Sequence, residues 1–458
     1  MSVPRVLLIP THHTGLADAI AAGVSEVVAA QGREVRYHHL GPLAPMSAWD
    51  RSEGAVFVDP ALTSEETLLS LYEVAVRHAD ISLLSTDVGL LDRTAGVDWV
   101  PADLVHLLDC PVVLVMDCTG WGSGIKVQTA GIKAHMQSAS LVAAILSGVV
   151  DQEHYSLLKK TLAEDGIRVI GGLFEERGLG WDSVAPSAWG LPLSTDTLQM
   201  VADQIDIGAM LALAGQRGFL AAHNRLSDHS AGGPVVLVAS GKGFTQWSRD
   251  SVEVLRSVGA QVRRLDLLED APVPAETSGL ILAGTLWPDV IPDIAMSTTL
   301  LQDIAAKVRT GLPTLALGGG MLLLLSKLQD TYGRTSELAG LIPAQGEILW
   351  DLESPAYVEV SARRDNVLLE KGEMVTGWAL SEFELTGAGQ SWDPPLVIRG
   401  AGTTTERRES FGDGALLCSP ALVHLGATRR MAERFVDHCK AYAATGSLPT
   451  RGSPSPRQ

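Results

Sequence analysis

The chain has 458 residues, of which 46% are hydrophobic, and its 53 acidic and 35 basic residues give a formal net charge of −18. This length is too great for one hydrophobic core and predicts two or three domains, and the acidic balance argues against nucleic acid and anionic membranes as main partners. No apolar run approaches the roughly 20 residues that span a bilayer, and no basic segment with an apolar signal core opens the chain, so we expect a cytoplasmic protein with no membrane contact.

The cysteines show neither the short paired spacing of a metal site nor the spacing of a disulfide framework. They are Cys110, Cys118, Cys418 and Cys439. We therefore expect reduced thiols that are mostly buried.

The first half of the chain alternates short apolar runs with segments of helical spacing. The runs that predict strands cover residues 5–9, 35–40, 81–84, 112–116 and 167–170. The segments that predict helices cover residues 16–30, 68–78, 135–145 and 195–214. Because continuous Val, Ile and Leu strands alternating with helices are typical of parallel sheets covered on both faces, we expect a doubly wound α/β domain. Gly171 and Gly172 predict a turn after the last strand.

The second half repeats this alternation after a stretch rich in Gly, Ser, Asn and His, which predicts a linker. Strands are expected at residues 235–239, 261–265, 279–283 and 312–317, and helices at 252–258, 300–308 and 427–442. Beyond residue 342, short alternating runs predict antiparallel strands at the edge of this domain. The predicted domains are 1–214 and 234–446, joined by the linker 215–233, and we expect the tail 447–458 to be disordered.

Residues 312–325 predict a strand, a glycine turn and a helix. Enzymes with a strained nucleophile turn place Ser or Cys at such an elbow, with the following N–H groups ready to stabilise an oxyanion. Here the turn runs from Leu317 to Met321 and offers no thiol, hydroxyl or amine. Either the reaction has been lost or the elbow was never catalytic.

Seven landmarks stand in an order that is typical of one known family. They are Leu40–Pro42, Val58–Pro60, Gly89–Asp92, Val113–Asp117, Trp189–Leu191, the elbow at 317–321 and Val423–Leu425. In this order the chain resembles the cobyrinate a,c-diamide synthases, which are ATP- and glutamine-dependent tetrapyrrole amidases. The resemblance implies an α/β fold of two doubly wound parallel-sheet domains, the first like the P-loop NTPases of the dethiobiotin synthetase type and the second like the class I glutaminases.

The resemblance also implies a phosphate loop near residue 15, where glycines, a Lys and a hydroxyl would bind ATP and magnesium. Ala17 stands at the Lys position and Asp18 at the hydroxyl position, so a carboxylate replaces a group that should attract phosphate. Asp18 is better explained as a helix cap. We therefore expect neither ATP nor Mg²⁺ in the usual mode, and we predict no metal site. The residues of this degenerate loop are Thr11, His12, His13, Thr14 and Gly15.

A second departure concerns the metal-binding acid that the resemblance implies after the third strand. Ser85 stands at that position, and Asp87 follows two residues later, where it substitutes only if the loop is remodelled. Asp92 and Asp117 stand at family-like places, and with Asp87 they are candidate cleft residues. An Asp that closes a strand is as often a cap as a ligand, so a structural role remains open for each.

A third departure lies in the glutaminase-like half. Leu317 stands at the position of the nucleophilic Cys, and His424 matches the family's histidine, which would be a vestigial base without a nucleophile. The expected oxyanion strand carries Trp287, and the segment whose family counterpart has two histidines carries Trp378. Both tryptophans are candidate cleft residues with flat apolar faces for a macrocycle. A buried structural role is the alternative for both.

These losses favour a catalytically inactive pseudo-amidotransferase that works by binding. Its ligand would be a tetrapyrrole, or its partner an active amidotransferase paralogue or a second copy of the chain. Two enzymatic interpretations stay open. One is altered chemistry on a tetrapyrrole or related carboxylate, and the other is diamidation with a remodelled ATP site and free ammonia.

Overall fold

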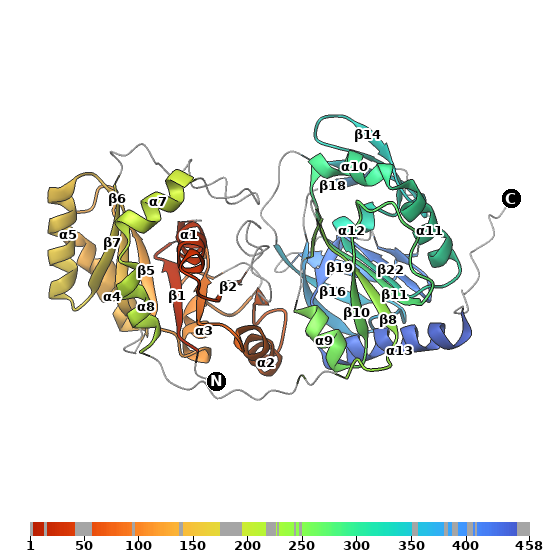
Figure 1. Cartoon of the computed structure of the whole chain (residues 1–458), viewed down its shortest axis with the longest axis horizontal. Helices are drawn as coiled ribbons and strands as arrows, with labels where there is room; N and C mark the ends of the chain where they lie inside the picture. Colours follow the sequence, from red (N-terminus) through yellow and green to blue (C-terminus); the bar gives the residue numbers. More distant parts are fainter. Residues whose placement is uncertain are drawn as a thin grey trace. The chain divides into compact units, whose positions relative to one another are not determined.

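The computed structural model divides the chain into two compact units, one mainly up to Arg225 and one mainly from Leu226 onward (Figure 1). The boundaries predicted at 214 and 234 stay predictions, and the predicted disordered tail lies outside the described residues. The structure describes residues 3–12, 16–41, 57–93, 97–136, 141–174, 195–216, 226, 229–241, 244–246, 250–349, 356–379, 383–386, 393–400, 406–407 and 410–446.

The first unit is built on a seven-stranded sheet with the order β3-β2-β4-β1-β5-β6-β7. Every described strand pair in it is parallel. The strands are almost continuously buried, which explains their uninterrupted apolar sequences. They are β1 (Arg5–Pro10), β2 (Val35–Leu40), β3 (Phe57–Val58), β4 (Ile81–Ser85), β5 (Val112–Asp117), β6 (Leu141–Val149) and β7 (Arg168–Phe174).

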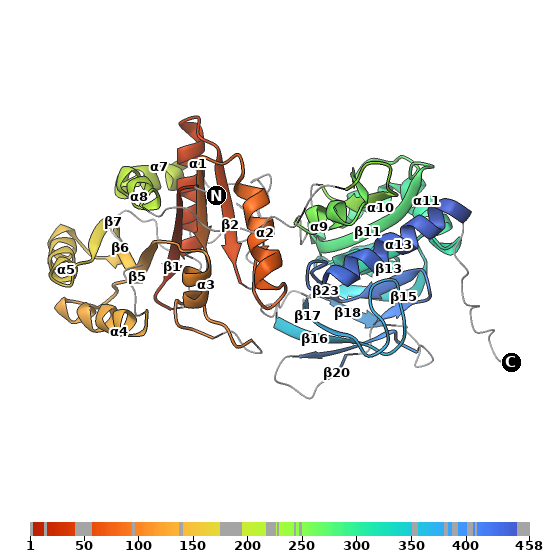
Figure 2. The same cartoon turned by 90° about the horizontal axis from the view of Figure 1, so that it is seen from below.

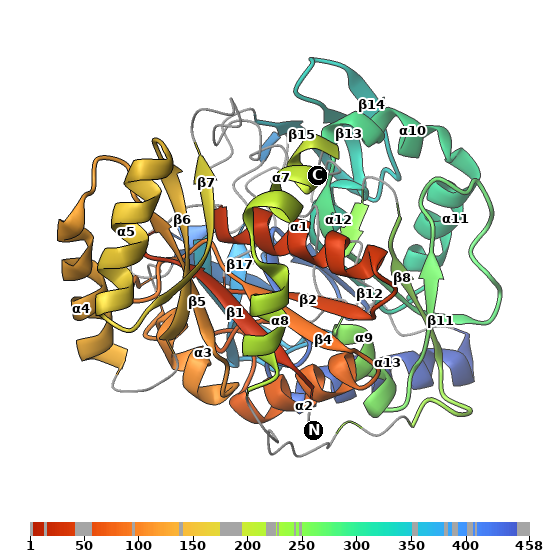
Figure 3. The same cartoon turned by 60° about the vertical axis from the view of Figure 1, so that its left-hand side comes forward.

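Helices cover both faces of this sheet, so the first unit is doubly wound as predicted. Figure 3 shows α1, α7 and α8 on one face, and Figure 2 shows α3 and α4 on the other. The helices are α1 (Leu16–Ala30), α2 (Glu65–Val76), α3 (Pro101–Leu107), α4 (Lys126–Met136), α5 (Gln152–Glu164), α7 (Thr195–Gln204) and α8 (Ile207–Ala214), with a short 3-10 turn η2 (Ser123–Ile125) before α4.

Side-chain alternation along β2 and β4 decides which helix each residue meets. His38 and Ser82 face α2, where the Tyr72 hydroxyl donates to Ser82 Oγ at 2.8 Å and the His38 and Tyr72 rings lie 5.2 Å apart. Tyr37 of β2 and Ser85 of β4 lie at alternate positions of these strands, so their side chains face α1 instead. The polar groups of these strands are thereby sorted onto two separate faces.

Three sequence predictions in this unit are wrong. The single helix expected at 195–214 is two helices, α7 and α8, which are separated at residues 205–206. The helix expected at 135–145 ends at Met136, and residues from Leu141 onward form β6. The turn expected at Gly171 and Gly172 is instead the middle of β7. A Cβ atom at Gly172 would lie 2.5 Å from the Tyr155 ring of α5, so this glycine permits close helix packing.

The second unit has a main sheet with the order β10-β8-β11-β12-β22-β21, and β9 pairs with β11. Its described pairs are parallel except those of β9 and β21. The strands are β8 (Val235–Ala239), β9 (Phe244–Gln246), β10 (Gln261–Leu265), β11 (Thr277–Leu286), β12 (Thr314–Gly318), β21 (Phe411–Gly412) and β22 (Leu416–Ser419).

The two faces of this sheet are covered by different helices. Leu280 and Leu282 of β11 join a core with residues of α11 (Thr298–Arg309), and Ile281 lies on the opposite face with Leu255 of α9 (Ser251–Ser257). The long α13 (Arg429–Thr445) packs beside α9. The remaining helical segments are η5 (Pro288–Val290), α10 (Ile291–Met296) and α12 (Gly319–Leu322).

Two smaller sheets complete the second unit, with the orders β14-β13-β15-β18 and β20-β19-β16-β17-β23. The antiparallel strands expected beyond residue 342 are confirmed. The strands are β13 (Leu325–Gln329), β14 (Thr335–Glu337), β15 (Ile342–Ile348), β16 (Ala356–Ala362), β17 (Met374–Ala379), β18 (Phe383–Thr386), β19 (Leu396–Gly400), β20 (Glu406–Arg407) and β23 (Ala421–Val423). Within the described part of the chain, no helix combines the length and apolar character needed to cross a membrane.

Candidate functional site

The glycine elbow is present, and its turn residue is Gly318. β12 ends at Gly318, whose φ of 59° and ψ of −129° lie where a side chain is strained. In a nucleophile elbow the residue in the sharp strand-to-helix turn carries the nucleophile. The backbone therefore locates that position at Gly318, one residue beyond Leu317, and the side chain there is a hydrogen atom.

The space that a nucleophile would need is occupied by other groups. A Cβ atom added to Gly318 would lie 2.8 Å from Leu422 Cδ2 and 2.9 Å from the carbonyl oxygen of Gly284. A carbonyl oxygen repels a developing oxyanion, which requires N–H donors at this place. The elbow thus lacks both the nucleophile and the room around it.

Leu317 itself points to the other side of β12. Its side chain lines a cavity of about 20 Å³ together with apolar residues of β8, β11 and α9, among them Val238, Ile281 and Leu255. A cavity of this size holds about one water molecule. The position that the sequence assigned to the nucleophile is a core position.

His424 is fully buried directly after β23, and both ring nitrogens face protein groups. Nδ1 accepts a hydrogen bond of 2.9 Å from the Gly426 N–H, and Nε2 lies 3.0 Å from Oδ2 of the equally buried Asp250. Because Nδ1 accepts a hydrogen bond, the ring proton of the neutral imidazole is assigned to Nε2. Asp250 also accepts from the Ser251 N–H at the start of α9. His424 therefore links the β23 end to α9.

The four cysteines are free and buried, as predicted. Cys418 of β22 stands opposite Ala316 of β12, and burial raises the pKa of its thiol far above the ordinary value. Burial, with a smaller contribution from Asp117, raises the pKa of Cys118 to about 12. Burial also raises the pKa of Cys439, so Cys118, Cys418 and Cys439 all lack the lowered pKa of a nucleophilic cysteine.

A polar cluster lies in the first unit, where α1 begins and where β2 and β4 end. The Ser85 hydroxyl donates to Asp18 Oδ1, and the Tyr37 hydroxyl lies 2.7 Å from Ser85 Oγ and 3.3 Å from Asp18 Oδ1. His39 Nδ1 lies 3.3 Å from the same oxygen. Ligand atoms of Asp18, His39 and Asp87 all lie within 4.8 Å of one another. We call these five residues the Asp18 cluster.

The electrostatics of the Asp18 cluster favour a carboxylate anion. Burial alone would raise the pKa of Asp18, but His39 and the hydrogen bonds from His39, Ser85 and Tyr37 together lower it below its ordinary value. Burial and the neighbouring Asp18 charge raise the pKa of Tyr37 well above its ordinary value. Asp18 is thus a largely buried anion, with a side chain that is 15% exposed, held beside an imidazole and two hydroxyl groups.

These residues do not fit Mg-ATP. Relative to the pattern that the resemblance implies, the hydroxyl and the acid have exchanged places, since Asp18 stands on α1 and Ser85 on β4. Ala17 is buried and offers no charge to a phosphate. Thr11 is half-buried and His12 exposed, with Thr11 Oγ1 and His12 Nδ1 3.3 Å apart. The remaining predicted loop residues, His13, Thr14 and Gly15, lie outside the described residues.

The other predicted cleft residues have separate surroundings within their own units. Asp92 is exposed. Asp117 accepts a hydrogen bond of 2.9 Å from the Thr119 N–H, so it closes a turn. Trp287 is half-buried beside the core of the second unit. Trp378 is fully buried in β17, edge-on to Tyr357 at 5.1 Å, and is therefore a core residue.

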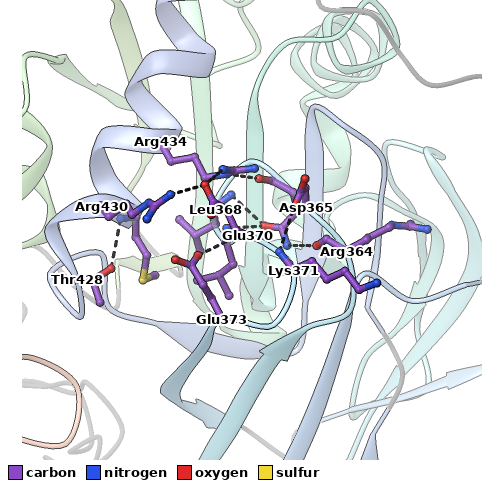
Figure 4. A network of polar contacts seen from close by, with 12 residues as sticks. Arg364, Asp365, Leu368, Glu370, Lys371, Glu373, Thr428, Arg430 and Arg434 are labelled. Carbon is purple, nitrogen blue, oxygen red and sulfur yellow. Dashed lines mark hydrogen bonds and ion pairs between the residues drawn. The ribbon is translucent and has the colours of Figure 1, made fainter.

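Sequence reasoning missed a shallow surface groove along α13, which is lined by residues of this helix and by Glu370. Figure 4 shows Arg430 and Arg434 reaching from this helix toward Glu370, whose Oε1 lies 2.5 Å from Arg430 Nη2 and 3.1 Å from Arg434 Nη1. Burial, and then the Arg434 charge, lower the pKa of His438 in the groove. Charged residues four apart on the exposed face of a predicted helix were the available signal.

Comparisons with known proteins found relatives of low identity that span most of the chain. No family model matches the chain. The cobyrinate a,c-diamide synthase of Caldanaerobacter subterraneus is 24% identical over 457 residues, which cover 96% of this chain and 99% of that protein. The enzyme of the same name from Priestia megaterium is 24% identical over 399 residues, covering 84% and 85%. The hydrogenobyrinate a,c-diamide synthase of Mycobacterium bovis is 25% identical over 401 residues, covering 83% and 85%.

Similar solved structures each cover about half of the chain. A glutamine amidotransferase has a TM-score of 0.31 at 14% identity and covers 45% of this chain and 100% of its own. The MinC:MinD cell division complex of Aquifex aeolicus has a TM-score of 0.30 at 14% identity and covers 47% and 98%.

The two units and the elbow define an α/β protein of two compact units, each built on a largely parallel sheet. The chain is a distant relative of the cobyrinate a,c-diamide synthases, to which it is similar over nearly its whole length.

Proposed function

We propose that this chain is a catalytically inactive relative of the cobyrinate a,c-diamide synthases that acts by binding in tetrapyrrole or cobalamin metabolism. The observation that carries the proposal is the elbow, where Gly318 replaces a nucleophile and where Leu422 and the Gly284 carbonyl oxygen close the space around it. A thioester cannot form without a thiol at this point. The names of the relatives suggest a carboxylate-bearing tetrapyrrole as ligand class.

The proposal is tested by following glutamate release from glutamine, with and without Mg-ATP and a corrinoid acid. The wild-type chain should release no more glutamate than its His424→Asn variant, because His424 has no nucleophile to activate. Glutamate release by the wild type that His424→Asn abolishes would overturn the proposal. Calorimetry with Mg-ATP should show no binding, since Ala17 and Asp18 replace the groups that hold a nucleotide.

The mode of binding is tested separately. Titration of corrinoids and porphyrins, followed by tryptophan quenching, should saturate if the chain holds a tetrapyrrole. If quenching does not saturate, the proposal narrows to a scaffolding or regulatory subunit. Purification from the native host then identifies its partner, either an active amidotransferase or a second copy of the chain.

A second candidate function is favoured by the Asp18 cluster. An enzyme of altered chemistry, acting on a tetrapyrrole or related carboxylate without glutamine hydrolysis, would need a preserved polar site, and this cluster is one. Incubation of candidate carboxylates with the chain, analysed by mass spectrometry, distinguishes it. Any product that disappears with Asp18→Asn would favour this second function over pure binding.

A further inference from the structure

The Asp18 cluster brings together three side chains of the types that bind transition metals. They come from three separate segments, namely the first turn of α1, the end of β2 and the loop after β4, and their ligand atoms lie within 4.8 Å of one another. His39 is 1% exposed, so the imidazole is part of the interior and not a surface residue. A buried imidazole close to two carboxylates offers a cation three ligands of suitable type.

The distances match the spacing of ligands around one ion. His39 Nδ1 and Asp18 Oδ1 are 3.3 Å apart. Two ligands of a tetrahedral ion with bonds of about 2.0–2.1 Å stand about 3.3 Å apart. An ion could therefore replace this hydrogen bond with little movement of either side chain. Asp87 is half-buried, so the three ligand side chains are accessible to solvent on the side of Asp87.

A second observation, independent of the spacing, points to a ligand. Asp18 Oδ1 receives the Ser85 and Tyr37 hydroxyls, whereas Asp18 Oδ2 is buried and has no hydrogen-bond partner among the described residues. The Asp18 side chain as a whole keeps 15% exposure, yet this oxygen has essentially none. A buried carboxylate oxygen without a donor is costly unless a cation satisfies it.

We propose that Asp18, His39 and Asp87 bind a divalent first-row transition-metal ion such as Zn²⁺. One imidazole and two carboxylates suit Zn²⁺ better than Mg²⁺ or Ca²⁺, which prefer oxygen ligands alone. Three protein ligands also leave a position for water or a substrate atom. Ser85 and Tyr37 act as positioning residues that fix the Asp18 carboxylate through hydrogen bonds.

The test uses the full chain, freed of metal by chelation, and titrates it with Zn²⁺ by calorimetry. Wild type should bind one ion, and Asp18→Asn, His39→Gln and Asp87→Asn should each weaken binding by at least about tenfold. His78→Gln, at an exposed histidine of the same unit, is the matched control and should leave the Kd unchanged. Mg²⁺ in excess should not displace Zn²⁺.

Co²⁺ gives a second readout that a folding defect does not mimic. Its visible absorption reports coordination number and nitrogen ligation, so the spectrum of wild type should show bands that His39→Gln loses while circular dichroism stays unchanged. No binding by wild type, equal Kd values in all variants, or displacement of Zn²⁺ by Mg²⁺ would each overturn the inference. Glutamine hydrolysis would overturn the proposed function and leave this inference intact.

Discussion

At the scale of single residues, two features of the elbow support the proposal that it is not catalytic. Gly318 removes the nucleophile, and Leu422 with the Gly284 carbonyl oxygen fills the volume that a larger side chain would enter. The neighbouring glycines have a packing role, because a Cβ at Gly320 would overlap the carbonyl oxygen of Leu282. The glycine run is therefore explained by close approach of strand and turn.

Restoring a thiol at the elbow should not restore glutamine hydrolysis. We expect Gly318→Cys to lower the free energy of unfolding by about 1–3 kcal/mol, because the new Cβ is strained at positive φ and crowds Leu422. Urea unfolding and glutamate release measure the two effects.

The control for this variant removes the crowding side chain. In a Leu422→Ala background, the additional cost of Gly318→Cys should shrink, because the two side chains then no longer meet. An undiminished cost would show that backbone strain alone acts. Substantial glutamate release by either cysteine variant would contradict the view that the site is closed.

The lowered pKa of Asp330 should make the free energy of unfolding depend on pH. Burial alone would raise the pKa of this carboxyl, but hydrogen bonds from Arg334 and Tyr332 outweigh burial and lower it. Because the folded pKa is depressed, the stabilisation is present above the ordinary value of 3.8 and is lost as pH falls through the lower folded value.

Asp330→Asn should therefore reduce the free energy of unfolding by about 1–2 kcal/mol at pH 7. The difference from wild type should diminish below about pH 4, where this carboxyl begins to take up a proton in the unfolded chain. Thermal melts across this pH range measure it. A constant difference at all pH values would mean that the charge is unimportant.

At the scale of elements, strand prediction was stronger than helix prediction. The parallel strands that were predicted in both units are confirmed, because continuous runs of Val, Ile and Leu are typical of strands buried on both faces. Leu141–Val149 contains alanines that favour a helix, and its position inside the sheet overrides that propensity. The helix expected after the elbow is a single turn, and Leu325 opens a strand, because a short apolar run does not by itself distinguish helix from strand.

The sequence could suggest only part of the candidate site. The sequence pointed to Asp18 beside the predicted phosphate loop and to Asp87 after the third predicted strand. It did not point to His39, whose nearness to them depends on the order of strands in the sheet. β2 pairs with β4 in a register that places His39 opposite Ser85, across 46 residues of chain. The backbone angles that locate the elbow at Gly318 also needed coordinates, since three successive glycines are equivalent in a sequence.

The ion pairs that join Glu370 to α13 give a prediction at the scale of elements. Glu370 accepts from Arg430 and Arg434 and is itself 41% exposed. Glu370→Gln should lower stability by no more than about 1 kcal/mol, because partly exposed ion pairs are screened by solvent. The difference should shrink further in 1 M salt. A loss that salt does not change would indicate a packing role for the side chain.

At the scale of the whole molecule, two units with separate cores need not unfold together. We expect two calorimetric transitions, and Zn²⁺ should raise only the one that belongs to the first unit, since a ligand stabilises the part of the chain that binds it. Asp18→Asn should abolish the shift and leave the other transition in place. A single transition, or a shift of both, would contradict this expectation.

Because all four cysteines are buried, their reaction with an alkylating reagent reports local unfolding of the chain. Cys110 and Cys118 lie in the first unit, and Cys418 and Cys439 lie in the second. In the folded state their thiols are shielded from alkylating reagents, so each reacts only when its surroundings open. The rate of labelling at each cysteine, read by peptide mapping, therefore measures how often each half of the molecule unfolds under native conditions.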